Sequence, residues 1–193
     1  MTMPTFADIR EVFDNDTRTK ERHRTTIEGF QRAGVLVPII QTAEGLLLLM
    51  TKRTEQVETH KGQISFPGGM ADSTDKSIID TALREAHEEV GIPTSSIETI
   101  GLLDDLPTPT GFVITPVVGI IKDMPPLTPN RNEVAEILCP PLDFFIDGKN
   151  ARTERREWRG QNHEIWFYQF GKHLIWGATA TITRSLLKKL RLI

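Results

Sequence analysis

Short apolar segments separated by glycine and proline dominate this chain and outnumber its helical patterns. Two of them, Gly34–Ile40 and Gly45–Met50, flank a polar turn and predict a hairpin. Further strand-like segments follow near 97–106, 112–121, 133–139, 151–157 and 163–170. These strands do not alternate strictly with helices, so they argue against a doubly wound parallel sheet. We predict an α+β fold in which a few helices pack on a mixed β-sheet.

Apolar residues at helical spacing predict helices over 5–13, 74–90 and 178–190. The middle helix is the clearest of the three. Thr74 or Asp75 is expected to cap its start, and Gly91 followed by Pro93 is expected to end it. Its apolar stripe should face the sheet and consists of Ile79, Ala82, Leu83, Ala86 and Val90.

Length and charge limit the organisation of the chain and its partners. The 193 residues predict one domain over 1–193, with residues 1–30 as an N-terminal helical extension packed on it. A net charge of −3 provides no overall basic field, so we expect no nucleic-acid partner, and no apolar run approaches 18 residues, so we expect no membrane partner. One cysteine, Cys139, excludes an intramolecular disulfide, and no signal peptide is visible. We therefore expect a cytoplasmic protein.

The segment Arg84–Ile92 concentrates the acidic chemistry of the chain. On a helical wheel Glu85, Glu88 and Glu89 share an arc of about 100° that borders the apolar stripe. Like charges at these spacings repel, and Arg84 stands four residues before Glu88 only. A hard cation such as Mg²⁺ or Mn²⁺ would remove the repulsion. Glu85 and Glu89 are then the direct ligands, with Glu88 oriented by Arg84 or sharing the metal; the alternative is a solvated acidic face.

A glycine pair precedes this helix, in the sequence Phe66-Pro67-Gly68-Gly69. Tandem glycines allow a sharp turn and a close approach of the backbone to a ligand. A short apolar segment, the glycine pair and the acidic helix in series therefore predict a cradle for a metal-bound diphosphate. For the glycine pair alone, a simple tight turn is the alternative.

The segment Arg84–Ile92 resembles the second half of the Nudix hydrolase box, which reads Arg-Glu-apolar-any-Glu-Glu-any-Gly-apolar. The first half departs from the box, because Gly69 lies 15 residues before Arg84 where the usual box has 14. Lys76 stands where the isolated glutamate of the box is counted, and Asp75 or Asp72 is a candidate replacement. The resemblance implies a Nudix fold, an α/β/α sandwich with the mixed sheet between helices.

The preceding segment resembles one branch of that family, the coenzyme A pyrophosphatases. Its signature is similar to Leu49-Met50-Thr51-Lys52-Arg53-Thr54, followed by Gly62 and Phe66-Pro67-Gly68-Gly69 at the same spacing. Met50, Thr54 and Glu58 depart from the signature, and Glu58 replaces an arginine. Segments around 110–119 and 175–179 are also similar to the branch.

This resemblance implies metal-dependent hydrolysis of the diphosphate of coenzyme A to 3′,5′-ADP and 4′-phosphopantetheine or its acyl form. Glu85 and Glu89 are implied as the principal ligands of Mg²⁺ or Mn²⁺, and Glu88 as a further ligand or a water-orienting group. Arg84 is implied to hold the carboxylates in place.

Residues that would contact the rest of a coenzyme A-like nucleotide lie just before and within the glycine pair. Arg53 occupies the arginine position of the signature, and Lys61, Gly68 and Gly69 complete the expected substrate-binding set. Lys52 and His60 are further candidates that ordinary surface roles explain equally well. A late carboxylate, Glu133 or Glu136, is a candidate general base or extra ligand.

Two other functions remain open from the sequence. One is a Nudix diphosphatase for another nucleoside diphosphate derivative, such as ADP-ribose, a dinucleotide or a nucleoside triphosphate. The other is a catalytically silent module that binds a nucleotide, which would predict damaged metal ligands. The oligomeric state also stays open, with a homodimer as one alternative.

Overall fold

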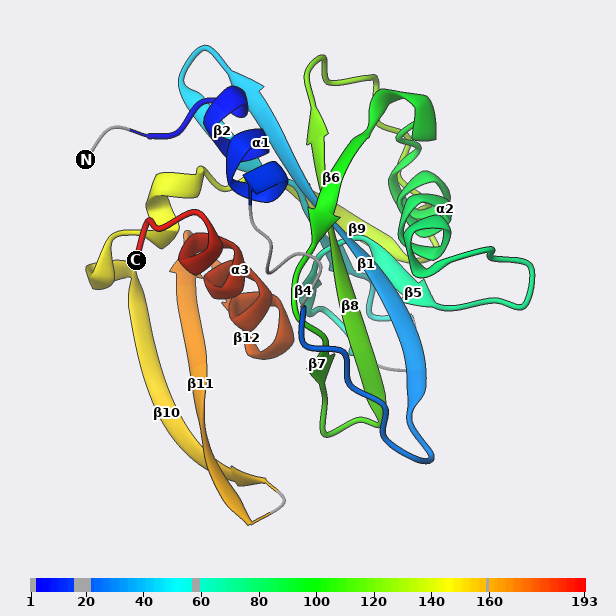
Figure 1. The fold of residues 1–193 in the computed structure, drawn as a ribbon, viewed down its shortest axis with the longest axis vertical. Coiled ribbons are helices and arrows are strands. Elements are labelled where there is room, and N and C mark those ends of the chain that lie inside the picture. Colours follow the sequence, from blue (N-terminus) through cyan, green and yellow to red (C-terminus); the bar gives the residue numbers. More distant parts are fainter. Residues whose placement is uncertain (1–2, 16–21, 57–59, 159) are drawn as a thin grey trace.

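The computed structural model describes residues 3–15, 22–56, 60–158 and 160–193. Its long helices are α1 (Phe6–Asn15), α2 (Ile78–Val90) and α3 (Gly177–Lys189), shown in Figure 1. Short 3₁₀ turns connect other elements: η2 (Thr94–Ser96), η3 (Leu142–Phe145) and η4 (Gly148–Asn150). The expected helices at 5–13 and 178–190 are confirmed.

The largest sheet has the order β2-β1-β8-β6, with β5 added beside β1 and β7 beside β8. Its strands are β1 (Gln31–Thr42), β2 (Gly45–Leu48), β5 (Gly68–Met70), β6 (Glu98–Leu102), β7 (Leu106–Pro107) and β8 (Phe112–Ile121). Strands β1 and β8 run parallel, whereas the other pairings in this sheet are antiparallel. The predicted mixed sheet and the predicted β1–β2 hairpin are therefore confirmed.

Two smaller antiparallel sheets accompany the mixed sheet. One has the order β4-β3-β9 and the other the order β10-β11-β12. Their strands are β3 (Met50–Arg53), β4 (Ile64–Ser65), β9 (Val134–Leu138), β10 (Ala151–Trp158), β11 (Gln161–Phe170) and β12 (His173–Trp176). The sequence predicted one sheet and did not predict the four-residue strand β12. The difference arises at Leu49, where the chain leaves the mixed sheet after β2 and enters a second sheet as β3.

Side chains of the mixed sheet alternate between two apolar cores. On β1, Val37 and Ile39 join a core with α1 and α3, while Leu36 and Ile40 join a core with α2. Helix α2 consequently lies on one face of the sheet and the other two helices lie on the opposite face (Figure 1). This arrangement is the expected α/β/α sandwich.

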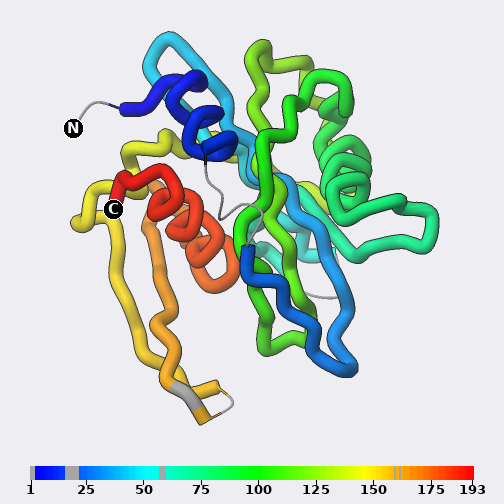
Figure 2. The backbone as a smooth tube through the Cα atoms, in the orientation of Figure 1, coloured from blue at the N-terminus to red at the C-terminus, as the bar shows by residue number. Residues whose placement is uncertain are grey.

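The first and last helices lie next to each other (Figure 2). Lys189 Nζ on α3 lies 5.3 Å from the centre of the Phe13 ring on α1. Helix α1 also packs on β6, where a Cβ on Gly101 would come within 2.4 Å of the Phe13 ring. Helix α1 thus packs on the body of the protein; the N-terminal extension over 1–30 and the single domain over 1–193 stay predictions.

A buried carboxylate, Asp105, fixes the segment after α1 to the mixed sheet. Its Oδ1 accepts from Arg22 Nη1 at 2.5 Å and from Thr115 Oγ1 at 2.7 Å. Its Oδ2 accepts from Arg32 Nη1 and from the Thr25 N–H, both at 3.0 Å. Burial by itself raises the pKa of Asp105, but these hydrogen bonds outweigh burial and lower the pKa to about 2. Both carboxylate oxygens are fully satisfied.

Helix α2 starts later than the sequence predicted. It begins at Ile78, and Ser77 caps it by accepting from the Asp80 N–H at 3.3 Å. The predicted caps Thr74 and Asp75 are therefore wrong, because the Asp75 carboxylate is engaged by Arg84 instead. Gly91 ends the helix as predicted, in a left-handed conformation with φ 75°.

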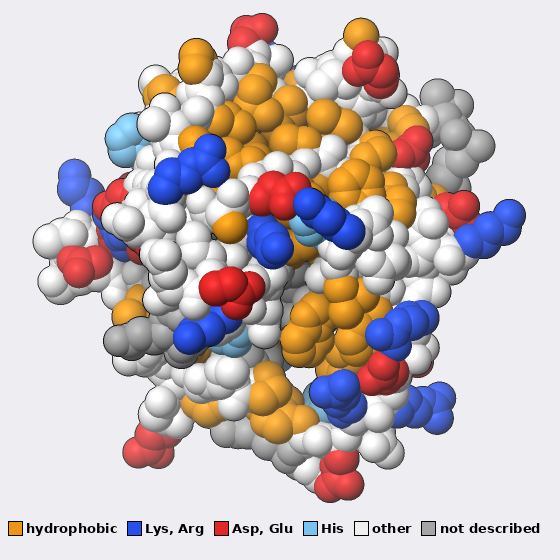
Figure 3. Space-filling model, turned by 180° about the vertical axis from the view of Figure 1, so that it is seen from behind, with side chains coloured by type: hydrophobic (Ala, Val, Ile, Leu, Met, Phe, Trp, Pro, Cys, Tyr) orange, Lys and Arg blue, Asp and Glu red, His pale blue; other side chains and the backbone are white. Residues whose placement is uncertain are grey.

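The surface mixes charges of both signs. On the face seen in Figure 3, Lys and Arg side chains are interspersed with Asp and Glu and do not gather into one basic patch. None of the helices in the described residues is long and apolar enough to span a bilayer.

Candidate active site

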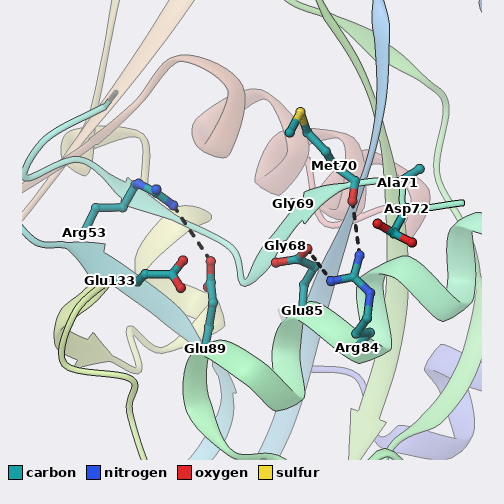
Figure 4. A pocket seen from close by; sticks show the side chains of 10 residues that line it. All are labelled: Arg53, Gly68, Gly69, Met70, Ala71, Asp72, Arg84, Glu85, Glu89 and Glu133. Carbon is teal, nitrogen blue, oxygen red and sulfur yellow. Dashed lines mark hydrogen bonds and ion pairs between the residues drawn. The ribbon is translucent and has the colours of Figure 1, made fainter. Parts of the chain in front are cut away.

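A cavity of about 340 Å³ opens between α2 and the glycine pair of β5. Figure 4 shows the ten residues that line it. They are Gly68, Gly69, Met70, Ala71 and Asp72 from β5 and the loop after it, Arg84, Glu85 and Glu89 from α2, and Arg53 and Glu133 from the opposite wall. The structure thus brings together the predicted residues Arg53, Gly68, Gly69, Arg84, Glu85 and Glu89.

The glycine pair is required by close packing. A Cβ on Gly68 would lie 2.5 Å from the Gly34 carbonyl oxygen on β1, because β5 is pressed against that strand. A Cβ on Gly69 would lie 2.5–2.6 Å from the atoms of the Glu85 carboxylate. The backbone therefore meets the acidic helix with no side chain between them, as the predicted cradle requires.

Arg84 organises the acidic groups at one end of the cavity. Its guanidinium donates to both oxygens of Asp75 at 3.0 Å, to Glu85 Oε1 at 2.7 Å and to Glu88 Oε2 at 3.1 Å. It also donates to the Met70 carbonyl oxygen at 3.1 Å. The wheel argument left Glu85 without a cation, but the long Arg84 side chain reaches its immediate neighbour. One arginine consequently links α2 to the loop after the glycine pair.

Asp75 is a positioning residue that the sequence left undecided. Its hydrogen bonds with Arg84 lower its pKa, with help from the Asp72 N–H and despite partial burial. Thr81 Oγ1 donates to it at 2.8 Å. Counting forward from Gly69 would have singled out Asp75, since five residues separate the two, and the Nudix box likewise has five residues between its first glycine and its isolated glutamate. Counting back from Arg84 led to Lys76 instead.

The two lining glutamates of α2 have different environments. Burial raises the pKa of Glu85, and Arg84 opposes that rise. Burial raises the pKa of Glu89 to about 8, an effect that Arg53 and the Gly68 N–H oppose and that Glu85 and Glu133 increase. Glu89 Oε2 is buried and has no hydrogen-bond partner among the described residues. A buried oxygen of this kind is short of a positive partner.

The late carboxylate that reaches the cavity is Glu133. Asn130 Nδ2 donates to Glu133 Oε1 at 3.0 Å, and the Asn130 N–H donates to the Glu89 carbonyl oxygen at 2.9 Å. The loop before β9 is thereby tied to the end of α2. The other candidate, Glu136, lies on β9 and accepts from His173 Nε2 at 3.2 Å, outside the cavity.

Other residues that the sequence singled out lie outside the cavity or outside the description. Glu88 does not line the cavity, and its side chain is 54% exposed. Lys61 is exposed in the turn before β4 and does not line the cavity either, so its role in substrate binding stays a prediction. Glu58, where the signature has an arginine, lies outside the described residues.

Comparison with known proteins gives consistent results. The NUDIX domain model matches residues 30–159. The chain is 42% identical over 161 residues to a protein named "Uncharacterized Nudix hydrolase NudL" from Photorhabdus laumondii, covering 83% of this chain and 86% of that protein. A protein of the same name from Pectobacterium atrosepticum is 42% identical over 156 residues, which is 81% of each chain.

The fold itself matches a solved structure. A MutT/nudix family protein from Enterococcus faecalis superposes with a TM-score of 0.56 at 16% identity, covering 98% of this chain and 76% of that one. At such low identity the likeness concerns the fold alone.

Proposed function

The chain belongs to the Nudix hydrolase family, and from that premise we propose that it hydrolyses the diphosphate of coenzyme A or its acyl derivatives. As a Nudix hydrolase it acts on a diphosphate substrate. The proposed products are 3′,5′-ADP and 4′-phosphopantetheine or its acyl form. One water is added across the P–O–P bridge, so that one phosphate gains its oxygen and the other keeps the bridging oxygen.

The observation that carries this proposal is the opposition of Arg53 and the acidic helix across one cavity. Arg53 belongs to the segment that resembles the coenzyme A signature, whereas Glu85 and Glu89 belong to the Nudix box. Both motifs therefore line the same space. An arginine beside a diphosphate site suits a phosphate oxygen, because its guanidinium donates in a planar fork.

As they stand, no three His, Cys, Asp or Glu side chains within the described ranges are arranged to hold a metal ion. The carboxylate oxygens that line the cavity are nonetheless the donor type that a hard divalent cation prefers. Arg84 holds Glu85 and Arg53 faces Glu89, so each carboxylate already has a cation near it. The buried, unpartnered Glu89 Oε2 is nevertheless the kind of oxygen that Mg²⁺ or Mn²⁺ binds. We propose Glu89 and Glu85 as the principal ligands, with Glu88 or Glu133 joining them.

When bound, such an ion neutralises charge on the diphosphate and lowers the pKa of a water molecule. The remaining work falls to the side chains. Arg84 holds Glu85 and Glu88 at fixed positions through the Asp75 anchor. Glu133 is held by Asn130 and lines the cavity opposite Glu89, which supports a role in orienting the attacking water or accepting its proton. Gly69 lets the Glu85 carboxylate lie directly against the backbone of β5.

The test is a substrate panel with purified protein and Mg²⁺ or Mn²⁺. Coenzyme A, acetyl-coenzyme A, ADP-ribose and NADH are compared by kcat/KM, with the products separated chromatographically. We expect coenzyme A or its acetyl form to give the highest value, with 3′,5′-ADP as the common product. Rapid cleavage of ADP-ribose without turnover of either coenzyme A form would overturn the proposed substrate. The proposed reaction, hydrolysis of a diphosphate, would still hold.

A second measurement tests the site. Glu85→Gln and Glu89→Gln should each abolish most turnover while the protein stays folded by circular dichroism. Glu44→Gln, an exposed glutamate in the β1–β2 turn, is the matched control. Full activity of the Glu89→Gln variant would show that the site is misassigned.

A further inference from the structure

Arg53 and Glu89 face each other across the cavity without completing a hydrogen bond. Arg53 Nη1 lies 3.8 Å from Glu89 Oε1, which is within ion-pair range but longer than a hydrogen bond. The Arg53 side chain is 24% exposed and the Glu89 side chain 4% exposed. The attraction between them is therefore purely electrostatic, in surroundings from which water is largely removed.

Each partner of this pair also keeps a buried atom unsatisfied. Arg53 Nε and Glu89 Oε2 have no hydrogen-bond partner within the described part of the chain. The pair therefore stays open, with a buried donor on one side and a buried acceptor on the other. An ion pair held in this way can take a positive ion at Glu89 and a negative oxygen at Arg53.

The backbone explains why Arg53 points into the cavity. The pairing of β3 with β9 shifts register between Lys52 and Arg53, where Ala135 of β9 is skipped. Such irregularities in a strand pair alter the local twist and are common beside active sites. The Arg53 N–H donates to the Gln63 carbonyl oxygen at 2.9 Å, and the next residue, Thr54, donates its N–H to the Glu133 carbonyl oxygen at 2.8 Å. The main chain is fixed on both sides, so only the head group of Arg53 is free to change partner.

We infer that Arg53 and Glu89 are an exchange pair that couples metal binding to diphosphate binding. Glu89 gives up Arg53 when a divalent cation arrives, and the released guanidinium then takes a phosphate oxygen of the diphosphate. This inference rests on the proposed function for the identity of the ligands. Its consequence is a change of sign: the charge of Arg53 opposes binding of the metal alone and favours binding of the metal-bound diphosphate.

Binding measurements test the two signs separately. Mn²⁺ alone is titrated into the full chain and followed by electron paramagnetic resonance, and imidodiphosphate is then titrated by calorimetry at saturating Mn²⁺. For Arg53→Gln we expect Mn²⁺ to bind about three to ten times more tightly and imidodiphosphate about ten times more weakly. Arg53→Lys keeps the charge and should leave the Mn²⁺ affinity near that of the wild type. Arg155→Gln, on the exposed strand β10, is the matched control and should change neither value.

The outcomes discriminate clearly. An Arg53→Gln variant that binds Mn²⁺ equally or more weakly would overturn the exchange pair, and so would unchanged affinity for imidodiphosphate. Wild-type protein that binds no Mn²⁺ would overturn it as well. If Arg53→Gln does not fold, Arg53→Met provides the same neutralisation with an apolar stem. The expected pattern without coenzyme A turnover would support the exchange pair and overturn only the proposed substrate.

Discussion

Two buried carboxylates of this protein, Asp105 and Glu89, have opposite electrostatic surroundings. Asp105 receives four hydrogen bonds, two of them from arginines, and its pKa falls to about 2. Glu89 has an unpartnered oxygen and an arginine at 3.8 Å, and burial raises its pKa to about 8. One carboxylate is saturated by its own chain, whereas the other is left short of positive charge.

The difference separates a structural charge from a functional one. When a buried charge has all its partners, removing one partner destabilises the folded state. A buried charge with incomplete partners costs folding energy and is useful only to a ligand that completes it. A substitution at Glu89 should therefore lower activity more than stability, and a substitution at Asp105 should lower stability more than activity.

The largest effect is expected at Glu89. Glu89→Gln should lower kcat/KM by about 100-fold or more, because even indirect supports of a metal site are worth about 10- to 100-fold. In EDTA its melting temperature should equal or exceed that of the wild type, since the substitution removes a carboxyl group whose ionisation burial makes unfavourable, as its pKa of about 8 indicates. Differential scanning fluorimetry and steady-state kinetics measure both. A Glu89→Gln variant that lost stability and kept activity would show that Glu89 has a structural role and not a functional one.

Asp105→Asn should show the complementary pattern. Breaking a buried ion pair leaves a charge uncompensated and costs about 3 kcal/mol of unfolding free energy. In a chain of this size that lowers the melting temperature by about 6–12 °C. Measured at 20 °C, where the variant is still folded, kcat/KM should stay within about twofold of the wild type. Asp104→Asn, its exposed neighbour, is the matched control.

Two glycines that are partners across β1 and β5 sharpen the comparison further. A methyl group at Gly69 would come within 2.5–2.6 Å of the Glu85 carboxylate, which can move aside by loosening its contact with Arg84. Gly69→Ala should therefore lower kcat about tenfold with little loss of stability. A methyl group at Gly34 meets the Ile78 carbonyl oxygen at 2.7 Å, and Gly34→Ala should cost about 1–3 kcal/mol because α2 must shift. Urea unfolding and kinetics on both variants separate the two effects. Equal losses of stability in Gly69→Ala and Gly34→Ala would contradict the distinction between a glycine needed for activity and a glycine needed for packing.

The smallest expected effect is a change in the unfolding free energy at acidic pH. The pKa of Asp105 is about 2 in the folded protein and 3.8 ordinarily, so the unfolded chain takes up the proton first. The stability that Asp105 contributes is present above about pH 4 and is lost as the pH falls toward 2. The difference in unfolding free energy between wild type and Asp105→Asn should therefore narrow between pH 4.5 and 2.5. A constant difference would show that the pKa of Asp105 is the same in the folded and unfolded states.

Local patterns predicted much of this structure. The apolar stripe of α2, its end at Gly91 and the shared arc of the glutamates all follow from residues within a few turns of one another. The resemblance added Arg53 and the glycine pair to the expected site, although they precede α2 in the sequence. The choice between Glu133 and Glu136 could not be made in this way. Strand alternation explains both, and only the loop anchored by Asn130 places Glu133 in the cavity.

Contacts over long separations were beyond the reach of sequence patterns. Asp105 takes its partners from Arg22, Thr25, Arg32 and Thr115, and nothing local marks it as buried. The division into three sheets depends on the exit of the chain at Leu49, which lies within a continuous apolar run. Asp75 was missed as the anchor of Arg84 because a capping role explained it equally well.

The parallel pairing of β1 with β8 has a consequence for the order of folding. Gln31 faces Phe112 and Ile40 faces Ile121, so the intervening chain forms one long closed loop. That loop contains every cavity residue except Glu133. Pairings between distant segments form slowly, because the entropy of closing the loop is lost before the contacts are gained. A chain that has formed only its hairpin and α2 displays the acidic residues on a helix without an opposing wall. During refolding, binding of manganese would thus follow the pairing of β1 with β8 and would occur later than the formation of helix.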